Sequence, residues 1–278
     1  HSLLYRKSYH HLINNYQEQT KMSYTIAMAG KGGTGKSTTA TLIIRYITEE
    51  LGKAVLAVDA DPNSTLGLSL GVEIQGTIAD IRDDVVEKKV DIPATMSKDR
   101  YIEYRIEESI IEENKFDLLT MGRPEGPKCY CYANNLLRRY LDKAEQSYPY
   151  IVIDTEAGME HLSRRTTNDV DLLIIAFEST IIGVHTANRI TELIESLPII
   201  IKKYIYVMCK VPAKGVSEKV NAEISKSGFE VSAKLTFDDE IYDHITSGES
   251  LLEISTENAV YSEIKNLIDN LVTVTTDK

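Results

Sequence analysis

The sequence predicts a doubly wound α/β fold, with a mostly parallel sheet and helices on both of its faces. Three observations predict this fold. Short, continuous apolar runs recur along the chain, as expected for strands that are buried on both faces. Segments with helical spacing of apolar residues separate most of these runs. The first run also ends in a glycine-rich loop that leads directly into a helix.

The first elements show this pattern in order. The apolar run Tyr24–Ala29 is bounded by a glycine and predicts a buried parallel strand. Ser37–Leu51 carries apolar residues at helical spacing, with Gly52 as the expected stop. Ala54–Val58 is a second apolar run, and Asp59 follows it. These segments predict a strand, loop, helix and strand unit.

The same alternation continues to the end of the chain. Further strands are predicted at five apolar runs, which are Phe116–Met121, Tyr150–Ile153, Leu172–Phe177, Tyr204–Met208 and Val231–Leu235. Helices are predicted at Asn134–Ala144, Val184–Leu197, Val216–Ser227 and Val260–Val272. The last helix has Glu263, Lys265 and Asp269 on its polar face instead of a basic array, so we predict that it packs on the sheet and does not bind a membrane.

The sequence indicates a single domain. It has no internal repeat and no long linker rich in proline, glycine or serine. We predict that residues 22–278 form this one domain, starting at Met22. Residues 1–21 are polar and lack the features of a signal peptide, so we interpret them as a non-native or disordered N-terminal extension.

Composition excludes several classes of protein. The chain has 278 residues, with 31 basic and 42 acidic side chains and a formal net charge of −11. This balance predicts no nucleic-acid partner and no binding to anionic membranes. Three cysteines cannot form a disulfide framework, which favours a reducing compartment and a cytoplasmic location. No run approaches the length of a membrane span.

A phosphate-binding loop is the strongest functional signal. The segment Gly30-Lys31-Gly32-Gly33-Thr34-Gly35-Lys36-Ser37 matches G-x-x-x-x-G-K-[ST] and lies between a predicted strand and helix. Its glycines let backbone N–H groups approach phosphate oxygens, and the following helix N-terminus favours negative charge. Lys36 is expected to neutralise the β- and γ-phosphates, and Ser37 to coordinate Mg²⁺. Thr38 completes the predicted nucleotide-binding set.

Three aspartates are candidates for the chemistry at this loop. Asp59 and Asp61 follow the second strand, and Asp154 closes the strand that starts at Tyr150. Because ligands of open α/β sheets bind at the carboxyl ends of the strands, these carboxylates are placed to serve Mg²⁺ or a water molecule. Asp154 has the position of a Walker B aspartate, and Gly158 after it is a candidate hinge that responds to the γ-phosphate. Asp59 could also serve only to cap a turn.

Cys129 and Cys131 form a candidate metal site. In an extended segment, residues two apart point to the same side, so both sulfurs could face one metal ion. Two thiolates are half of a tetrahedral site, and a two-fold dimer would supply the other half. Thiolate chemistry alone favours zinc or cuprous copper, and two packed, inert cysteines are the alternative.

Several motifs together resemble a known family. These are the loop K-G-G-x-G-K-[ST] with its early Lys31, the segment D-A-D-P-N-S from Asp59, G-R-P-E-G leading into C-Y-C, and D-T-E-A-G-M-E-H-L-S-R from Asp154. The chain resembles the CooC-type nickel-insertion ATPases, which serve carbon monoxide dehydrogenase or acetyl-CoA synthase. They belong to the class of P-loop proteins with a deviant Walker A loop that includes MinD, ParA and the nitrogenase iron protein.

The resemblance implies an ATP-dependent metallochaperone. It implies a homodimer that forms around ATP, with Lys31 reaching the partner's nucleotide and Asp61 serving hydrolysis to ADP and phosphate. It also implies Ni²⁺ or Zn²⁺ bound by Cys129 and Cys131 of both protomers, and a nickel metalloenzyme as the client. Hydrolysis would then alter the dimer and release the metal ion.

The chain departs from the family pattern at two places. Cys209 stands where the wider class has an asparagine that reads adenine, so we expect Lys210, Pro212 and the backbone of residues 236–238 to contribute to base binding instead. Lys128 stands where relatives have a glycine before the first cysteine.

Two alternative functions stay open on the same fold. One is a MinD- or ParA-like positioning ATPase whose partner is a membrane or DNA surface. The other is an iron–sulfur carrier or electron-transfer ATPase with its cysteines on a dimer axis.

Overall fold

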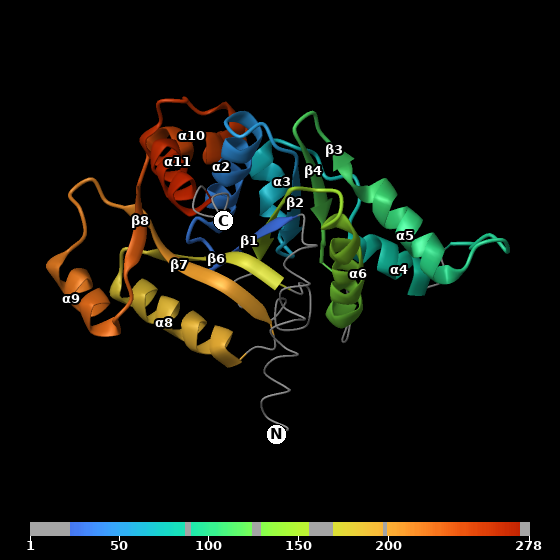
Figure 1. Cartoon of the computed structure of the whole chain (residues 1–278). Helices are drawn as coiled ribbons and strands as arrows, with labels where there is room; N and C mark the ends of the chain where they lie inside the picture. Colours follow the sequence, from blue (N-terminus) through green and yellow to red (C-terminus); the bar gives the residue numbers. More distant parts are fainter. Residues whose placement is uncertain (1–22, 87–89, 124–128, 156–168, 197–198, 273–278) are drawn as a thin grey trace, which may run out of the picture.

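The structure is a computed structural model that describes residues 23–86, 90–123, 129–155, 169–196 and 199–272. Its described strands form one eight-stranded sheet in the order β3-β4-β2-β5-β1-β6-β7-β8 (Figure 1). The strands are β1 (Tyr24–Ala29), β2 (Val55–Ala60), β3 (Ile111–Glu112), β4 (Phe116–Thr120), β5 (Tyr150–Thr155), β6 (Asp169–Glu178), β7 (Ile200–Val211) and β8 (Val231–Thr236). All neighbouring strands are parallel except β3 and β4.

Helices lie on both faces of this sheet (Figure 1). One face is covered by α2 (Lys36–Glu49), α3 (Thr65–Leu70), α10 (Asp239–Ser247) and α11 (Ala259–Val272). The other is covered by α4 (Ile78–Val86), α5 (Lys98–Ser109), α6 (Cys129–Ala144), α8 (Ile181–Ser196) and α9 (Glu218–Ser227). A short 3₁₀ helix, η1 (Leu251–Glu253), precedes α11.

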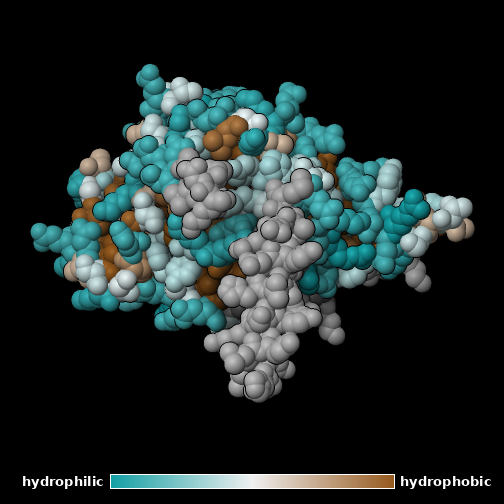
Figure 2. Space-filling view, in the orientation of Figure 1, coloured by the Kyte–Doolittle hydropathy of each residue, from teal (hydrophilic) through white to brown (hydrophobic). Residues whose placement is uncertain are grey.

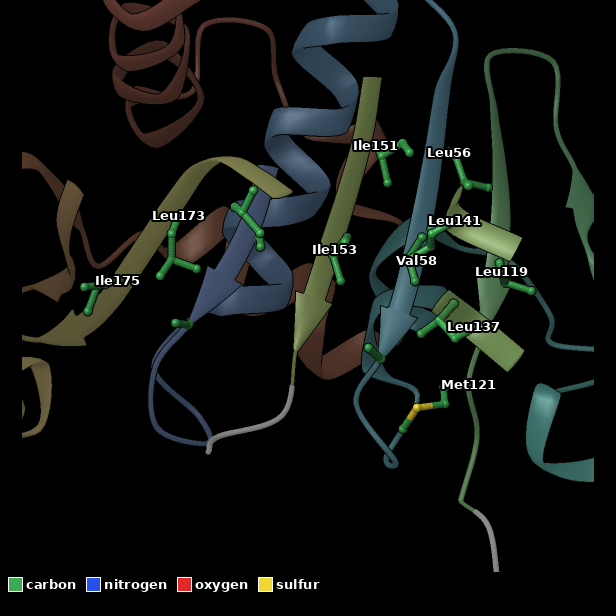
Figure 3. Close-up of a cluster of buried hydrophobic side chains, with 14 of the residues drawn as sticks. Leu56, Val58, Leu119, Met121, Leu137, Leu141, Ile151, Ile153, Leu173 and Ile175 are labelled. Carbon is green, nitrogen blue, oxygen red and sulfur yellow. The ribbon is translucent and has the colours of Figure 1, made fainter. Parts of the chain in front are cut away.

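The alternation of side chains along the strands explains the two layers. In β2, Leu56 and Val58 face the α6 layer, whereas Val55 and Ala57 face the α2 layer. Figure 3 shows the hydrophobic core between the sheet and the α6 layer, where Val58 and Leu119 from the sheet meet Leu137 from α6. Burial on both faces is the reason that these strands read as continuous apolar runs in the sequence.

The register of the strands brings the candidate acidic residues together. Asp59 of β2 pairs with Thr120 of β4 on one side and with Asp154 of β5 on the other. The strand β1 lies between β5 and β6, so the loop that follows it leaves the same edge of the sheet. The topology therefore places the phosphate loop and the aspartates at the carboxyl ends of adjacent strands.

Most predicted elements are confirmed, and two details of the site residues are corrected. The predicted α/β fold is the fold observed. Asp59 was expected just after its strand, but β2 extends to Ala60 and includes it. The cysteines were expected in an extended segment, and this is wrong, because α6 begins at Cys129 and includes Cys131. Residues in a helix are about 100° apart around its axis, so these two positions are separated by about 200°.

The last helix packs on the sheet, as predicted. Val260, Ile264 and Ile268 of α11 are buried in the layer that contains α2. No helix within the described ranges has both the length and the apolar character needed to cross a membrane. The described surface visible in Figure 2 is mostly hydrophilic, with hydrophobic residues in small separate areas. The predicted extension at residues 1–21 lies outside the described residues, and the assignment of a single domain stays a prediction.

Candidate nucleotide site

The phosphate loop is a tight turn built around one carbonyl oxygen. The Lys31 carbonyl accepts hydrogen bonds from the Thr34 amide at 3.3 Å, the Thr34 hydroxyl at 2.8 Å and the Lys36 ammonium at 3.4 Å. Gly33 and Gly35 have φ angles of +80° and +99°, which L side chains rarely adopt. The sequence K-G-G-T-G-K therefore specifies the conformation of this loop locally.

Gly30 is required by close packing at the start of the loop. A Cβ atom there would lie 2.3 Å from the Ala176 carbonyl oxygen of β6. Because the obstacle is backbone in a central strand, it cannot move aside easily. A glycine here lets the loop pass directly over the edge of the sheet.

The predicted phosphate and Mg²⁺ ligands lie at the beginning of α2. Lys36 is buried, with its side chain folded against the loop, while Ser37 and Thr38 are half-buried. The Ser37 hydroxyl is 2.8 Å from the Thr65 hydroxyl of α3. Lys31 is exposed.

Asp59 and Asp61 shape the loop that follows β2. The fully buried Asp59 carboxylate accepts hydrogen bonds from the backbone amides of Asp61 at 3.1 Å and Leu66 at 2.9 Å. The Asp61 carboxylate accepts from the Asn63 amide at 2.8 Å and from its side-chain nitrogen at 2.9 Å. The turn-capping interpretation of Asp59 thus matches its contacts, and Asp61 is held at the edge of the site.

Asp154 has the environment expected of a residue beside a cation. Its carboxylate is buried, and neither oxygen has a hydrogen-bond partner among the described residues. Burial raises its pKa to about 6, while the nearby Ser37 hydroxyl and Lys36 ammonium lower it. The Ser37 hydroxyl is near this carboxylate but makes its clear hydrogen bond with Thr65.

Asp59 is also difficult to ionise. Burial and the neighbouring Asp154 raise its pKa to about 7, against the lowering effect of the two backbone amides. Two adjacent buried carboxylates with raised pKa values are a pair that a bound cation would stabilise in ionised form.

A cavity of about 260 Å³ opens beside the loop. Phe237, Tyr242 and Ile245 line it, and their side chains are about half exposed. Gly35, Thr38, Thr39, Cys209, Lys210, Leu235, Thr236, Asp238, Ile241 and Val260 complete the lining. The cavity therefore joins the start of α2 to the segment after β8, where the sequence predicted contacts to the base.

Some of the residues that were expected to contribute to base binding line this cavity. Cys209 lies in the cavity wall, and burial raises the pKa of its thiol to about 12, so it is protonated. Lys210 lines the cavity and its ammonium contacts the Gly33 carbonyl oxygen and, at 3.5 Å, the Glu178 carboxylate. Residues 236–238 line it as well, whereas Pro212 is not among the lining residues. The aromatic wall of Phe237 and Tyr242 was not predicted, because nothing in the local sequence links it to the loop.

The donors present fit a Mg²⁺-nucleotide. Mg²⁺ in such sites uses a few protein oxygens together with phosphates and water. Ser37 supplies a hydroxyl, and the oxygens of Asp154 are available to a metal-bound water. The loop amides and Lys36 suit the phosphates, and the adjoining cavity suits a base.

The predicted metal-binding cysteines are described only by their backbone. Cys129 is the first residue of α6, and Cys131 lies in its first turn. Among the side chains that the structure describes, no three His, Cys, Asp or Glu residues are grouped to hold a metal ion. Gly158 and Lys128 lie outside the described residues.

Comparison with known proteins decides the family. Residues 23–207 match the AAA_31 family, described as an AAA domain. An uncharacterized ATP-binding protein of Methanocaldococcus jannaschii is 38% identical over 249 residues, which cover 89% of this chain and 98% of that protein. The chain belongs to the AAA_31 family. It is a P-loop ATPase of the MinD/ParA class.

Two further relatives bear on the expectations for this AAA_31 protein. The carbon monoxide dehydrogenase accessory protein CooC of Rhodospirillum rubrum is 31% identical over 188 residues, covering 63% of this chain and 70% of CooC. The septum site-determining protein MinD of Pyrococcus horikoshii, solved with Mg-ADP, has a TM-score of 0.65 at 18% identity and covers 91% of this chain and 97% of that one. The structural likeness confirms the predicted fold.

Proposed function

We propose that this AAA_31 protein is an ATP-hydrolysing homodimer that assists nickel insertion into carbon monoxide dehydrogenase or acetyl-CoA synthase. In this proposal the phosphate loop, Lys36 and Lys210 bind ATP, and Ser37 and Asp154 serve Mg²⁺. Asp61 orients the attacking water, and Lys31 acts on the partner's nucleotide. The similarity to CooC supports the nickel client.

The position of the cysteines at the start of α6 is the observation that carries the metal-binding part of the proposal. Cys129 and Cys131 lie in the first turn of a helix that continues to Ala144. A helix N-terminus lowers the pKa of a thiol there and so favours the thiolate that a metal ion needs. In the proposal, nickel or zinc is cargo held by these cysteines of both protomers.

Backbone hydrogen bonds join Met121, which precedes this helix in the sequence, to β2 and α4. The amide of Met121 donates a hydrogen bond to the Asp59 carbonyl oxygen at 2.8 Å, and the Met121 carbonyl accepts one from Ala79 of α4 at 2.9 Å. The segment that leads to Cys129 starts at the next residue, Gly122. A Cβ at Gly122 would lie 2.3 Å from the Thr77 hydroxyl oxygen, so this start point is tightly held. The end of β2 is therefore joined to the residue just before Gly122.

The experiment that tests the proposal is an anaerobic titration with Ni²⁺ and with Zn²⁺, read by elemental analysis and light scattering. We expect about one metal ion per dimer for the wild type. The Cys129→Ser/Cys131→Ser double variant should bind none and should still bind ATP. The variant Cys209→Ser is the matched control, because Cys209 is buried far along the chain in the cavity wall. Equal metal binding by wild type and double variant would refute the proposal.

A positioning ATPase is the second candidate, and one observation favours it. The separation of positions 129 and 131 by about 200° around the axis of α6 removes the simplest geometry for a shared two-thiolate site. The fold is also that of the septum site-determining MinD. Co-sedimentation with anionic liposomes or with DNA in the presence of ATP would support this function, and the metal titration would then show no specific site.

A further inference from the structure

Thr65 is a residue of the site that neither the motifs nor the family resemblance assigned. It is the first residue of α3, at the end of the loop that carries Asp59 and Asp61. Its hydroxyl oxygen lies 2.8 Å from that of Ser37, and no other hydrogen bond joins the side chains of this loop to the start of α2 among the residues described. The contact spans 28 positions in the sequence, so it depends on the fold.

The loop around Thr65 is built to hold its hydroxyl at Ser37. The Asp59 carboxylate accepts from the Leu66 amide at 2.9 Å, directly after Thr65. On the other side, the Ser64 amide donates to the Asp61 carbonyl at 2.9 Å. Ser64 has a φ of +51°, a conformation that non-glycine residues adopt only when their surroundings require it. Both acidic residues therefore fix the backbone beside Thr65.

The chemistry of a hydroxyl ligand explains what this contact does. A serine hydroxyl has one proton and two lone pairs. When it coordinates Mg²⁺ through a lone pair, its proton must point to another acceptor. Thr65 is at hydrogen-bond distance, and Asp154 is the competing acceptor nearby. If the proton goes to Thr65, both buried oxygens of Asp154 stay free to bind a Mg²⁺-coordinated water.

We propose that Thr65 is a positioning residue for Mg²⁺, which accepts the Ser37 proton and so reserves the Asp154 carboxylate for the water shell of the ion. This inference rests on the proposed role of Ser37 as a Mg²⁺ ligand. In this role Thr65 acts through Ser37 and not as a direct ligand of phosphate or metal. Thr65 also links the loop that carries Asp59 to the nucleotide site, because it ends that loop and contacts Ser37.

Thr65→Val tests the proposal, since valine keeps the shape and removes the hydroxyl. The readout is the binding of a fluorescent ATP analogue titrated with Mg²⁺ and, separately, in EDTA. We expect the Mg²⁺ concentration at half-saturation to rise about 10-fold, in the range seen when groups behind a metal ligand are lost. Affinity in EDTA should stay within about two-fold. Thr65→Ser, which keeps the hydroxyl, should restore the wild-type Mg²⁺ dependence.

Ser69→Ala is the matched control on the same helix. The Ser69 hydroxyl donates to the Thr65 carbonyl at 3.1 Å, so its loss perturbs α3 without touching Ser37. We expect the wild-type Mg²⁺ dependence for this variant. If Thr65→Val fails to fold, Thr65→Ala takes its place. Wild-type Mg²⁺ dependence in the hydroxyl-free variant, or equal weakening with and without Mg²⁺, overturns the role of Thr65. An absence of Mg²⁺-dependent binding in the wild type would instead refute the proposed function.

Discussion

Asp59 is a buried residue that shapes its loop and whose own ionisation is changed by its burial. Its two carboxylate oxygens hold the backbone amides of Asp61 and Leu66, and this fixes the loop that carries Thr65. The same burial, together with Asp154, raises its pKa to about 7. The folded, nucleotide-free protein thus keeps a carboxyl group that binds a proton more tightly than it does in the unfolded chain.

The free energy of unfolding should depend on pH through Asp59 and Asp154. Both pKa values are raised above the ordinary value of 3.8, to about 7 and about 6. The folded state therefore binds more protons between pH 4 and pH 7, so the free energy of unfolding falls as the pH rises through this range and levels off above it. The slope is at most about 1.4 kcal/mol per pH unit for each group.

Urea unfolding of nucleotide-free protein from pH 5 to pH 8 measures this effect. Asp59→Asn should flatten the dependence and should stabilise the protein most at pH 8, because asparagine keeps an acceptor without the charge. Asp91→Asn, at an exposed position, is the control and should follow the wild type. A wild-type stability that rises from pH 5 to pH 7 with a slope that Asp59→Asn leaves unchanged would contradict the prediction.

At the scale of elements, α10 connects the cavity beside the phosphate loop to the rest of the fold. Asp238 caps this helix by accepting from the Ile241 amide at 3.0 Å, and the same oxygen accepts from the Asn258 side chain at 2.9 Å. Phe237 before the cap and Tyr242 after it form the aromatic wall, and their ring centroids are 5.7 Å apart. The cap therefore positions the wall as well as the helix.

Asp238→Ala should affect both stability and nucleotide binding. Loss of an N-cap costs about 1 kcal/mol of unfolding free energy, and release of the aromatic wall should weaken ATP binding several-fold. Ser217→Ala is the matched control, because Ser217 caps α9 in the same way and is not among the residues that line the cavity. It should lower stability by a similar amount and leave ATP affinity unchanged. Calorimetry of unfolding and of ATP binding separates the two effects, and equal ATP affinity in both variants would contradict the role of the cap.

The same scale shows what the sequence could and could not predict. The strands that are buried on both faces could be predicted because each is a continuous apolar run. The phosphate loop could be predicted because its conformation is encoded within eight residues. The helices α3, α4, α5 and α10 were not predicted, and α5 is strongly polar, with only Ile102 and Ile106 buried. The first turn of α6 was taken as extended, since the C-Y-C triplet has no helical periodicity of its own. Thr65 and the aromatic wall depend on contacts between distant segments, which no local pattern contains.

At the scale of the whole molecule, the nucleotide edge carries much of the exposed apolar surface. Nine large apolar side chains among the described residues are at least 40% exposed. Six of them follow the carboxyl ends of β2, β6 and β8, and they are Leu68, Ile181, Ile182, Phe237, Tyr242 and Ile245. The exposed Lys31 lies at the same edge. An edge with this character suits the proposed dimer, in which ATP is enclosed between two protomers.

Ile182 provides the sharpest test of that dimer, because the chain offers a matched residue at the opposite edge. Ile182, at the start of α8 after β6, is 70% exposed, and Ile200, the first residue of β7, is 62% exposed. Glutamate at either position should leave the fold intact, since neither side chain is buried.

We expect Ile182→Glu to abolish dimer formation with a slowly hydrolysed ATP analogue, measured by light scattering after gel filtration. Ile200→Glu should form the wild-type dimer. ATP binding by monomeric Ile182→Glu should persist, because the phosphate loop is unchanged. If both variants dimerise, or if only Ile200→Glu fails to, the contact between protomers does not lie at the nucleotide edge, and Lys31 could not reach a partner's nucleotide.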